Sequence, residues 1–379
     1  MGIVRTLLAI AVVFAHSPWN DGFVFTGGQA AVQCFYLISG FVISHALTSN
    51  NVYSRPYRFY LNRILRLYPM YLIVAVASLG FALYYDQGFL NIFQRGPVLA
   101  KVLLGVTNIT LIGQDWVMFT AIHGGSLQLA KNFRDSDFPV FAGLLLPQAW
   151  SLGVEITFYA IAPFIVRRQK WLVSVLIASF IVRSGLLVSG IGFEDPWSYR
   201  FFPAEVGLFA AGALAHQKLG PLWERIIALR PRLPVIGTAL FWILTVTYFM
   251  IPMPEGYLLP MYLAVSCVML PVLSEFQSKS CFDRWIGQFS YPIYLGHSLV
   301  ERILHSFPPH IAFNNDISVT LANVGFSLLL AFMLNSLIGV RVERIRERVR
   351  SGASVKSLSA YDITRVSGDS SRHESRQQS

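Results

Sequence analysis

Continuous apolar stretches of about twenty residues recur along this chain and constrain its fold more than any other feature. Only helices and closed barrels satisfy every backbone hydrogen bond in lipid, and a barrel would show shorter segments of alternating hydrophobicity. The 379 residues are 54% hydrophobic and 13% charged, whereas soluble domains average about 25% charged residues. The sequence therefore predicts an all-α integral membrane protein. We place ten transmembrane helices at 3–19, 30–48, 67–85, 148–166, 171–190, 203–218, 232–252, 256–275, 286–305 and 318–340.

Basic residues gather in a few of the segments that connect these stretches. The segment 49–66 contains four arginines and no acidic residue, and 167–170 and 218–232 are basic as well. Because cytoplasmic loops of membrane proteins carry an excess of Lys and Arg, we place these segments and the basic tail inside the cell. Both termini are then cytoplasmic. The net charge of +10 follows from this bias, and we expect no nucleic-acid partner.

One apolar stretch, 97–113, does not fit the count of crossings. It is interrupted by Gly105, Asn108 and Gly113. The span before it ends outside and the span after it begins outside, so an even number of crossings must separate them. The simplest solution makes 97–113 re-entrant or interfacial, because irregular backbone at membrane depth is tolerated where it lines a protein cavity.

The composition divides the chain into two parts. Residues 1–340 form the predicted transmembrane domain, and 341–379 form a basic, polar cytoplasmic tail. The first ten residues of the tail place three apolar side chains on one helical face among arginines, which predicts an amphipathic turn on the anionic inner leaflet. We expect the rest of the tail to be largely disordered.

Ionisable residues inside membrane spans are functional candidates, because lipid makes them costly. The first predicted span contains Arg5 and His16, eleven residues apart, or about 16 Å along a helix. Arg5 then lies at the cytoplasmic end and His16 toward the outer half. Either they anchor and cap the helix at the two interfaces, or they act on a ligand. Gln33, in the second span, either bonds across helices or contacts a ligand.

Arginines also form pairs within the basic segment before the third span. Arg63 and Arg66 are three residues apart and share one face of a helix. One explanation is anchoring by the excess of positive charge inside. The other is a guanidinium cluster that binds phosphates bidentately.

An acidic residue lies within the span 148–166. Glu155 is about two turns inside its outer boundary, where a carboxylate needs a partner. The partner is either a structural arginine elsewhere or part of a functional site. Trp150 and Tyr159, in the same span, are compatible with the aromatic belt at a membrane interface.

The span 286–305 carries His297, Glu301 and His305 at successive four-residue steps, hence on one face. This layout resembles a set of metal ligands, but zinc motifs are tighter patterns. The three cysteines show no metal-type spacing either. We therefore expect no metal.

The predicted depths of these residues fall into two groups. The three arginines lie on the cytoplasmic side, whereas His16, Glu155 and His297 lie at mid-to-outer depth on three separate spans. A protein that holds a phosphorylated donor from inside, and reacts its far end with an acceptor from outside, would have this arrangement.

Taken in order, these residues resemble acyltransferase family 3, integral membrane acyltransferases that modify surface carbohydrates. The resemblance implies the same ten-span arrangement with both ends inside. Gln33 departs from it, because many relatives have an acidic residue there. The similarity covers about residues 1–340 and rests on Arg5 with His16, Gly27-Gly28 followed by Phe35 to Phe41, Arg63 to Pro69, Trp150 to Leu152 with Glu155 and Tyr159, and Ser290-Tyr291 to His297.

The resemblance implies O-acylation, most often acetylation, of an exopolysaccharide, lipopolysaccharide or other lipid-linked glycan. The donor substrate is acyl-coenzyme A, with acetyl-CoA expected. Arg63, Arg66 and Arg5 would bind its phosphates at the inner face, and the pantetheine arm would pass between spans toward His16.

The resemblance also suggests catalytic roles. His16 would be the general base on the acceptor hydroxyl, since a neutral imidazole accepts a proton near neutral pH; an acyl-histidine relay is a variant. Glu155 would fix the imidazole tautomer or orient the acceptor, and His297 would polarise the carbonyl or hold the sugar. The residues assigned to substrate binding are Gln33, Trp150 and Tyr159.

These expectations describe a multi-pass enzyme of the inner (plasma) membrane. Its partners would be a carbohydrate acceptor, membrane lipid and the glycan biosynthesis machinery. The alternative is a proton-coupled transporter of a small solute or glycan precursor, because buried His, Glu and Arg also form proton relays. Against transport, the sequence shows no internal repeat and no paired broken helices in matching halves.

Overall fold

Helices make up most of the fold. The computed structural model describes residues 1–19, 25–49, 53, 55–306 and 315–351. In this part of the chain the principal helices are α1 (Gly2–His16), α2 (Gly27–Thr48), α3 (Pro56–Tyr85), α4 (Gln87–Arg95), α5 (Val98–Thr110), α6 (Trp150–Ile165), α7 (Gln169–Val188), α8 (Phe202–Leu214), α9 (Gly220–Leu229), α10 (Leu233–Val246), α11 (Glu255–Lys279), α12 (Cys281–Ile286), α13 (Ser290–Ser306), α15 (Asp316–Leu334) and α16 (Val340–Ser351).

Several of these helices are suited to a bilayer. In the described ranges, five helical stretches are long and apolar enough to cross a membrane, and a sixth is reached if the bent pair Phe202–Leu229 and Leu233–Val246 counts as one span. Helices α1 and α5 are apolar but shorter than the roughly 20 residues that a crossing needs. The chain is therefore a helical multi-pass membrane protein, as predicted. The count of ten spans and the cytoplasmic position of both termini stay predictions.

The segment between the third predicted span and α6 contains the interrupted apolar stretch. It forms α5, whose thirteen residues rise about 20 Å, less than the roughly 30 Å of hydrocarbon. This length favours the re-entrant or interfacial interpretation. A small antiparallel hairpin follows, β1 (Thr120–His123) and β2 (Ser126–Leu129), which departs from the all-α prediction. Its turn is Gly124-Gly125, where both φ angles are positive, a conformation that glycine adopts without steric cost.

Helices α2 and α8 pack backbone against backbone. A Cβ added at Gly40 of α2 would lie 2.0 Å from the carbonyl oxygen of Phe209 on α8. In the reverse direction, a Cβ at Gly212 would lie 2.0 Å from the carbonyl oxygen of Leu37. Two glycines therefore allow the close approach that small residues provide between membrane helices.

Helix α1 is buried along most of its length and is fixed at its N-terminal end. The fully buried carboxylate of Asp283, on α12, accepts hydrogen bonds from the backbone N–H groups of Gly2 (2.7 Å) and Ile3 (2.9 Å). These N–H groups have no carbonyl partner within the helix. The cap therefore sets the position of α1, with Arg5 near one end and His16 at the other.

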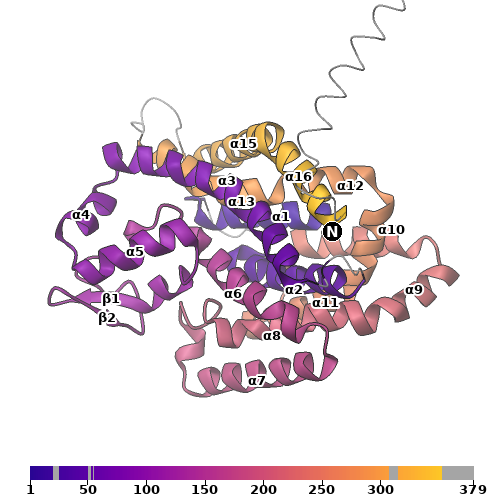
Figure 1. Ribbon diagram of the computed structural model, residues 1–379. Coiled ribbons are helices and arrows are strands. Elements are labelled where there is room, and N and C mark those ends of the chain that lie inside the picture. Colours follow the sequence, from indigo (N-terminus) through magenta and orange to yellow (C-terminus); the bar gives the residue numbers. More distant parts are fainter. Residues whose placement is uncertain (20–24, 50–52, 54, 307–314, 352–379) are drawn as a thin grey trace, which may run out of the picture.

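The C-terminal helix α16 forms at the predicted start of the tail and packs against α3 (Figure 1). Its position on the lipid surface stays a prediction. Nη2 of Arg346 donates to Oδ1 of Asn62 on α3 over 3.3 Å. One side of this helix therefore has polar partners on α3. The rest of the predicted tail, from residue 352, lies outside the described residues.

Candidate active site

Two histidine rings from different helices meet at the end of α1. The ring centroids of His16 and of His297, on α13, are 5.1 Å apart. Nδ1 of His16 lies 2.8 Å from the carbonyl oxygen of Val12, and Nδ1 of His297 lies 2.8 Å from that of Tyr294. A carbonyl oxygen only accepts, so each Nδ1 donates, and Nε2 of a neutral ring carries the lone pair. Both imidazoles are therefore held in the tautomer in which Nε2 acts as a base.

The two imidazoles differ in access. His16 is exposed, whereas His297 is fully buried. Nε2 of His297 has no hydrogen-bond partner in the described part of the chain. The pair thus combines an accessible base, His16, with a buried lone pair on His297. The structure therefore brings together two of the three residues predicted to be catalytic.

Tyr294 connects the histidine pair to a large cavity. Its ring centroid lies 6.0 Å from that of His297, and the residue also lines the cavity. Its hydroxyl donates to the carbonyl oxygen of Gln148 (2.7 Å) and lies 2.6 Å from Oγ of Ser151. These contacts join α13 to the start of α6. Tyr294 and Ser151 therefore mark the end of the cavity that adjoins the histidines.

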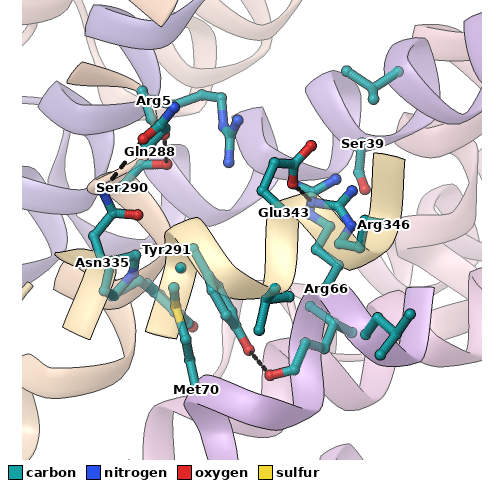
Figure 2. A pocket seen from close by; sticks show the side chains of 18 of the residues that line it. Arg5, Ser39, Arg66, Met70, Gln288, Ser290, Tyr291, Asn335, Glu343 and Arg346 are labelled. Atoms are coloured by element: carbon teal, nitrogen blue, oxygen red, sulfur yellow. Dashed lines mark hydrogen bonds and ion pairs between the residues drawn. The ribbon is translucent and has the colours of Figure 1, made fainter. Parts of the chain in front are cut away.

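The cavity has a volume of about 720 Å³, within the size range of ligand pockets. Its walls come chiefly from α2, α3, α6, α13 and α16, with Arg5 from α1, and Figure 2 shows some of the side chains that face it. Positive charge exceeds negative charge by three. The charged lining residues are Arg5, Arg66, Arg284, Arg344, Arg346 and Arg350, with Glu155, Glu343 and Glu347.

Two of the predicted phosphate-binding residues lie in this cavity. Arg5 on α1 and Arg66 on α3 line it together, and both interact electrostatically with Glu155. Each guanidinium carries five N–H donors and no acceptor. The cavity therefore offers a set of donors suited to an anionic ligand, at the end of α1 opposite to His16.

Glu155 lies in the cavity with Arg5 and Arg66, and two hydroxyl groups are its hydrogen-bond partners. Its carboxylate accepts short hydrogen bonds from the hydroxyls of Ser39 on α2 and Tyr159 on α6. Of the two roles that we predicted for Glu155, fixing the tautomer of His16 is performed by the carbonyl of Val12, and orienting the acceptor stays a prediction. The sequence gives the depth of a residue along its helix and leaves open the direction in which that helix presents it. A catalytic role for Glu155 stays a prediction.

Arg63 lies beside the cavity without lining it. It is buried, its guanidinium carbon lies 5.6 and 5.7 Å from the ring centroids of Phe59 and Tyr159, and it donates to Oδ1 of Asn62 (3.2 Å). Its Nε and Nη1 find no hydrogen-bond partner among the residues described. Tyr159 is buried between this guanidinium and Glu155. Contact of Arg63 with phosphate and of Tyr159 with substrate stay predictions.

Gln33 forms a hydrogen bond across helices, the first of its two predicted alternatives. Its side-chain amide donates to both carboxylate oxygens of Glu205 on α8, at 3.2 and 3.3 Å. Arg183 on α7 forms a close ion pair with the same carboxylate. The amide nitrogen of Gln33 is thus engaged in a buried network, and its assignment to substrate binding stays a prediction.

Trp150 belongs to an aromatic cluster around an arginine that sequence reasoning missed. The guanidinium carbon of Arg200 lies 4.3 Å from the centroid of Trp150 and 4.7 Å from that of Tyr199, and Nη2 donates to Asp195 (2.8 Å). Arg200 is also close enough to His16 to interact with it electrostatically. The aromatic-rich stretch from Trp197 onward was the signal that could have indicated this residue. Contact of Trp150 with a substrate stays a prediction.

The metal-like pattern on α13 does not form a cluster. Glu301 is partly buried and His305 is exposed near the end of α13. Within the described ranges, no group of three or more His, Cys, Asp or Glu side chains is placed to hold a metal ion.

Comparison with known proteins identifies the family of this chain. Residues 1–336 match the acyltransferase domain of the acyltransferase 3 family. The chain belongs to this family. As an acyltransferase 3 protein, it is an acyltransferase of the O-acetyltransferase type. The family match ends before α16 begins at Val340.

Two curated proteins resemble this acyltransferase 3 chain at low identity. An uncharacterized protein of Aquifex aeolicus (strain VF5) is 28% identical over 204 residues, which cover 53% of this chain and 89% of that protein. Nodulation protein 10 of Rhizobium leguminosarum bv. viciae is 24% identical over 260 residues, which cover 64% of each. The second match thus spans less than two thirds of that protein. No solved structure is significantly similar to the chain.

Proposed function

We propose that this membrane acyltransferase moves an acyl group, expected to be acetyl, from acyl-coenzyme A to a hydroxyl of a cell-surface or lipid-linked carbohydrate. The observation that carries the proposal is the layout of α1. One end of this helix places Arg5 in an arginine-rich cavity, and the other end presents His16 with an accessible Nε2 lone pair. Tyr294 adjoins both the cavity and the histidine pair.

The donor fits the cavity by charge and size. The phosphates of coenzyme A are strongly anionic, and the lining charges sum to +3. Arginine binds phosphate through parallel N–H···O bonds. With the phosphates held near Arg5 and Arg66, the pantetheine arm runs in the direction of α1, so that the thioester reaches the end of the cavity near Tyr294 and Ser151.

His16 then supplies the base. Its Nε2 takes the proton of the acceptor hydroxyl while the hydroxyl oxygen attacks the thioester carbonyl. When the tetrahedral intermediate collapses, the C–S bond breaks and the departing sulfur takes the proton back from the imidazole. The products are an O-acyl ester and free coenzyme A, so protons and electrons balance without a metal or a covalent enzyme intermediate.

Groups around His16 support this step. The unpartnered Nε2 of His297 favours a positive charge on the neighbouring His16 ring during proton transfer. The guanidinium of Arg200, stacked on Trp150, provides a polar and aromatic surface of the kind that binds a sugar ring.

We place the enzyme in the inner membrane. The donor then arrives from the cytoplasm, and the glycan biosynthesis machinery supplies a glycan on the other side.

Substitution of His16 tests the proposal directly. Membranes that contain the wild-type protein should incorporate label from acetyl-coenzyme A, labelled on the acetyl group, into the surface glycan of the host. His16→Ala should lower incorporation by about 10²–10⁴-fold, the usual contribution of a general base. The matched control is His305→Ala, an exposed histidine on α13, which should retain wild-type incorporation. Incorporation by His16→Ala at the wild-type rate, with equal protein in the membrane, would refute the assignment.

A further inference from the structure

The helix α16 forms a wall of the arginine-rich cavity. It follows α15 through the wide helical turn η8 (Asn335–Gly339) and lies against α3 (Figure 1). At the join, a Cβ on Gly339 would lie 2.9 Å from Cε of Met70 on α3, so the chain passes close to that helix. Farther along, Nδ2 of Asn62 donates to the carbonyl oxygen of Arg346 (3.5 Å). These contacts hold α16 over the cavity.

The inner face of α16 carries alternating charges. Glu343 forms close ion pairs with both Arg346 and Arg350. Arg346 is only 15% exposed, and its Nε has no hydrogen-bond partner within the described residues. Figure 2 shows Arg346 and Glu343 directed toward the same space as Arg5 and Arg66. A partly buried guanidinium whose sheltered Nε donor is unused, on the wall of a cavity, indicates a site for an anion.

The contribution of α16 to the cavity can be counted. Without this helix the charged lining residues would be three arginines and one glutamate. The helix adds three further arginines and two glutamates, so it supplies half of the arginines at the site. One of its two glutamates, Glu343, is already bound to two of those arginines. An anionic ligand that displaced this carboxylate would gain both guanidinium groups.

We propose that α16 is part of the donor site, with Arg346 and Arg350 as ligands of a phosphate group of coenzyme A and Glu343 as the counter-ion that the phosphate displaces. This inference rests on the proposed use of acyl-coenzyme A. It concerns a helix beyond residue 336, where the match to the acyltransferase 3 family ends. The donor phosphates thus meet arginines from three elements, α1, α3 and α16.

The shared chemistry of the ligand is a phosphate ester, and a lipid headgroup is a second source of it. Purified full-length protein is therefore placed in nanodiscs of phosphatidylcholine, and binding of coenzyme A is measured by calorimetry. The same titration is repeated with acetyl-pantetheine, which has the arm but no phosphate, and in nanodiscs that contain phosphatidylglycerol.

Arginine variants give the first outcome. Arg346→Gln and Arg350→Gln should each weaken coenzyme A binding about tenfold or more, the usual effect of losing a hydrogen bond to a charged group. Weak binding of acetyl-pantetheine should not change. The matched control is Arg341→Gln, an exposed arginine on α16 that does not line the cavity, and it should bind coenzyme A as the wild type does.

Glu343→Gln gives an outcome of the opposite sign. It removes the carboxylate that competes with phosphate, so coenzyme A should bind more tightly, by up to about fivefold, since exposed to half-buried ion pairs contribute up to about 1 kcal/mol. Misfolding weakens binding and does not strengthen it. This variant therefore keeps the inference open to refutation even if an arginine variant does not fold.

Three results would overturn the inference in distinguishable ways. If the α16 variants bind coenzyme A normally while Arg66→Gln binds it weakly, α16 is not part of the donor site and the proposed function stands. If the α16 variants change only the effect of phosphatidylglycerol, the helix binds lipid headgroups. If the wild-type protein does not bind coenzyme A at all, the proposed donor itself is wrong.

Discussion

The contact between α2 and α8 can be tested by a single methyl group at Gly40. A Cβ there would lie 2.0 Å from the carbonyl oxygen of Phe209, whereas such contacts essentially never fall below 3.0 Å. The two helices would therefore have to separate by about 1 Å. Overpacking a core costs about 1–3 kcal/mol, and the better helix propensity of alanine returns up to about 1 kcal/mol. Gly40→Ala should therefore lower the free energy of unfolding by up to about 2 kcal/mol.

This separation also reaches the cavity. Gly40 follows Ser39, whose hydroxyl donates to Glu155, so a shift of α2 moves one wall of the donor site. A misplacement of about 1 Å in an enzyme can reduce its rate by about a hundredfold. Thermal unfolding of the purified protein should show a melting temperature lower by up to about 3 °C, and transfer of labelled acetyl should fall well beyond what this loss of stability explains.

Gly80 provides the matched control for this experiment. It lies on α3, and a Cβ there would meet no atom within 4 Å. Gly80→Ala should keep wild-type transfer and gain up to about 1 kcal/mol of stability from helix propensity. If Gly40→Ala melts at the same temperature as Gly80→Ala, the close backbone contact between α2 and α8 does not exist in solution.

Two further predictions concern stability and turnover. Burial raises the pKa of Asp115, in the segment between α5 and α6, from its usual 3.8 to about 6. The folded state therefore favours the protonated carboxyl. The stability that this provides is complete below about pH 4 and is lost as the pH rises through 6, at a cost of ~3 kcal/mol. Asp115→Asn should therefore flatten the fall in melting temperature between pH 4 and 8, and an unchanged slope would exclude this carboxyl as its source. His297→Ala should lower the rate of acyl transfer by about ten- to a hundredfold while coenzyme A binds as before in calorimetry; a matching loss of coenzyme A affinity would place His297 in the donor site instead.

The sequence was sufficient for the features that depend on one helix at a time. Long apolar stretches predicted a helical membrane protein, and eleven residues on one helix predicted that Arg5 and His16 lie at opposite ends of α1. The motifs identified the family. These properties follow from composition and helical rise, which do not require knowledge of neighbouring elements.

Features that depend on how helices face one another were harder to predict. The carboxylate of Glu155 accepts a hydrogen bond from Ser39 on another helix, α2, and spacing along α6 does not contain this information. The position of α16 depends on hydrogen bonds to Asn62. Arg200 lies outside any predicted span, so the rule that singles out charges within lipid did not apply to it.

The cap on α1 has a consequence for how the two reactants are aligned. Asp283 accepts a hydrogen bond from the backbone N–H of Gly2. His16 follows fourteen residues later, about 21 Å away along the same helix. Anchoring at Gly2 thereby fixes the position of the imidazole relative to Arg5 and the cavity. The length of α1 therefore sets a minimum length for the donor. An acyl donor whose flexible arm is shorter than the distance between the two ends of α1 would not bring its acyl group within reach of His16.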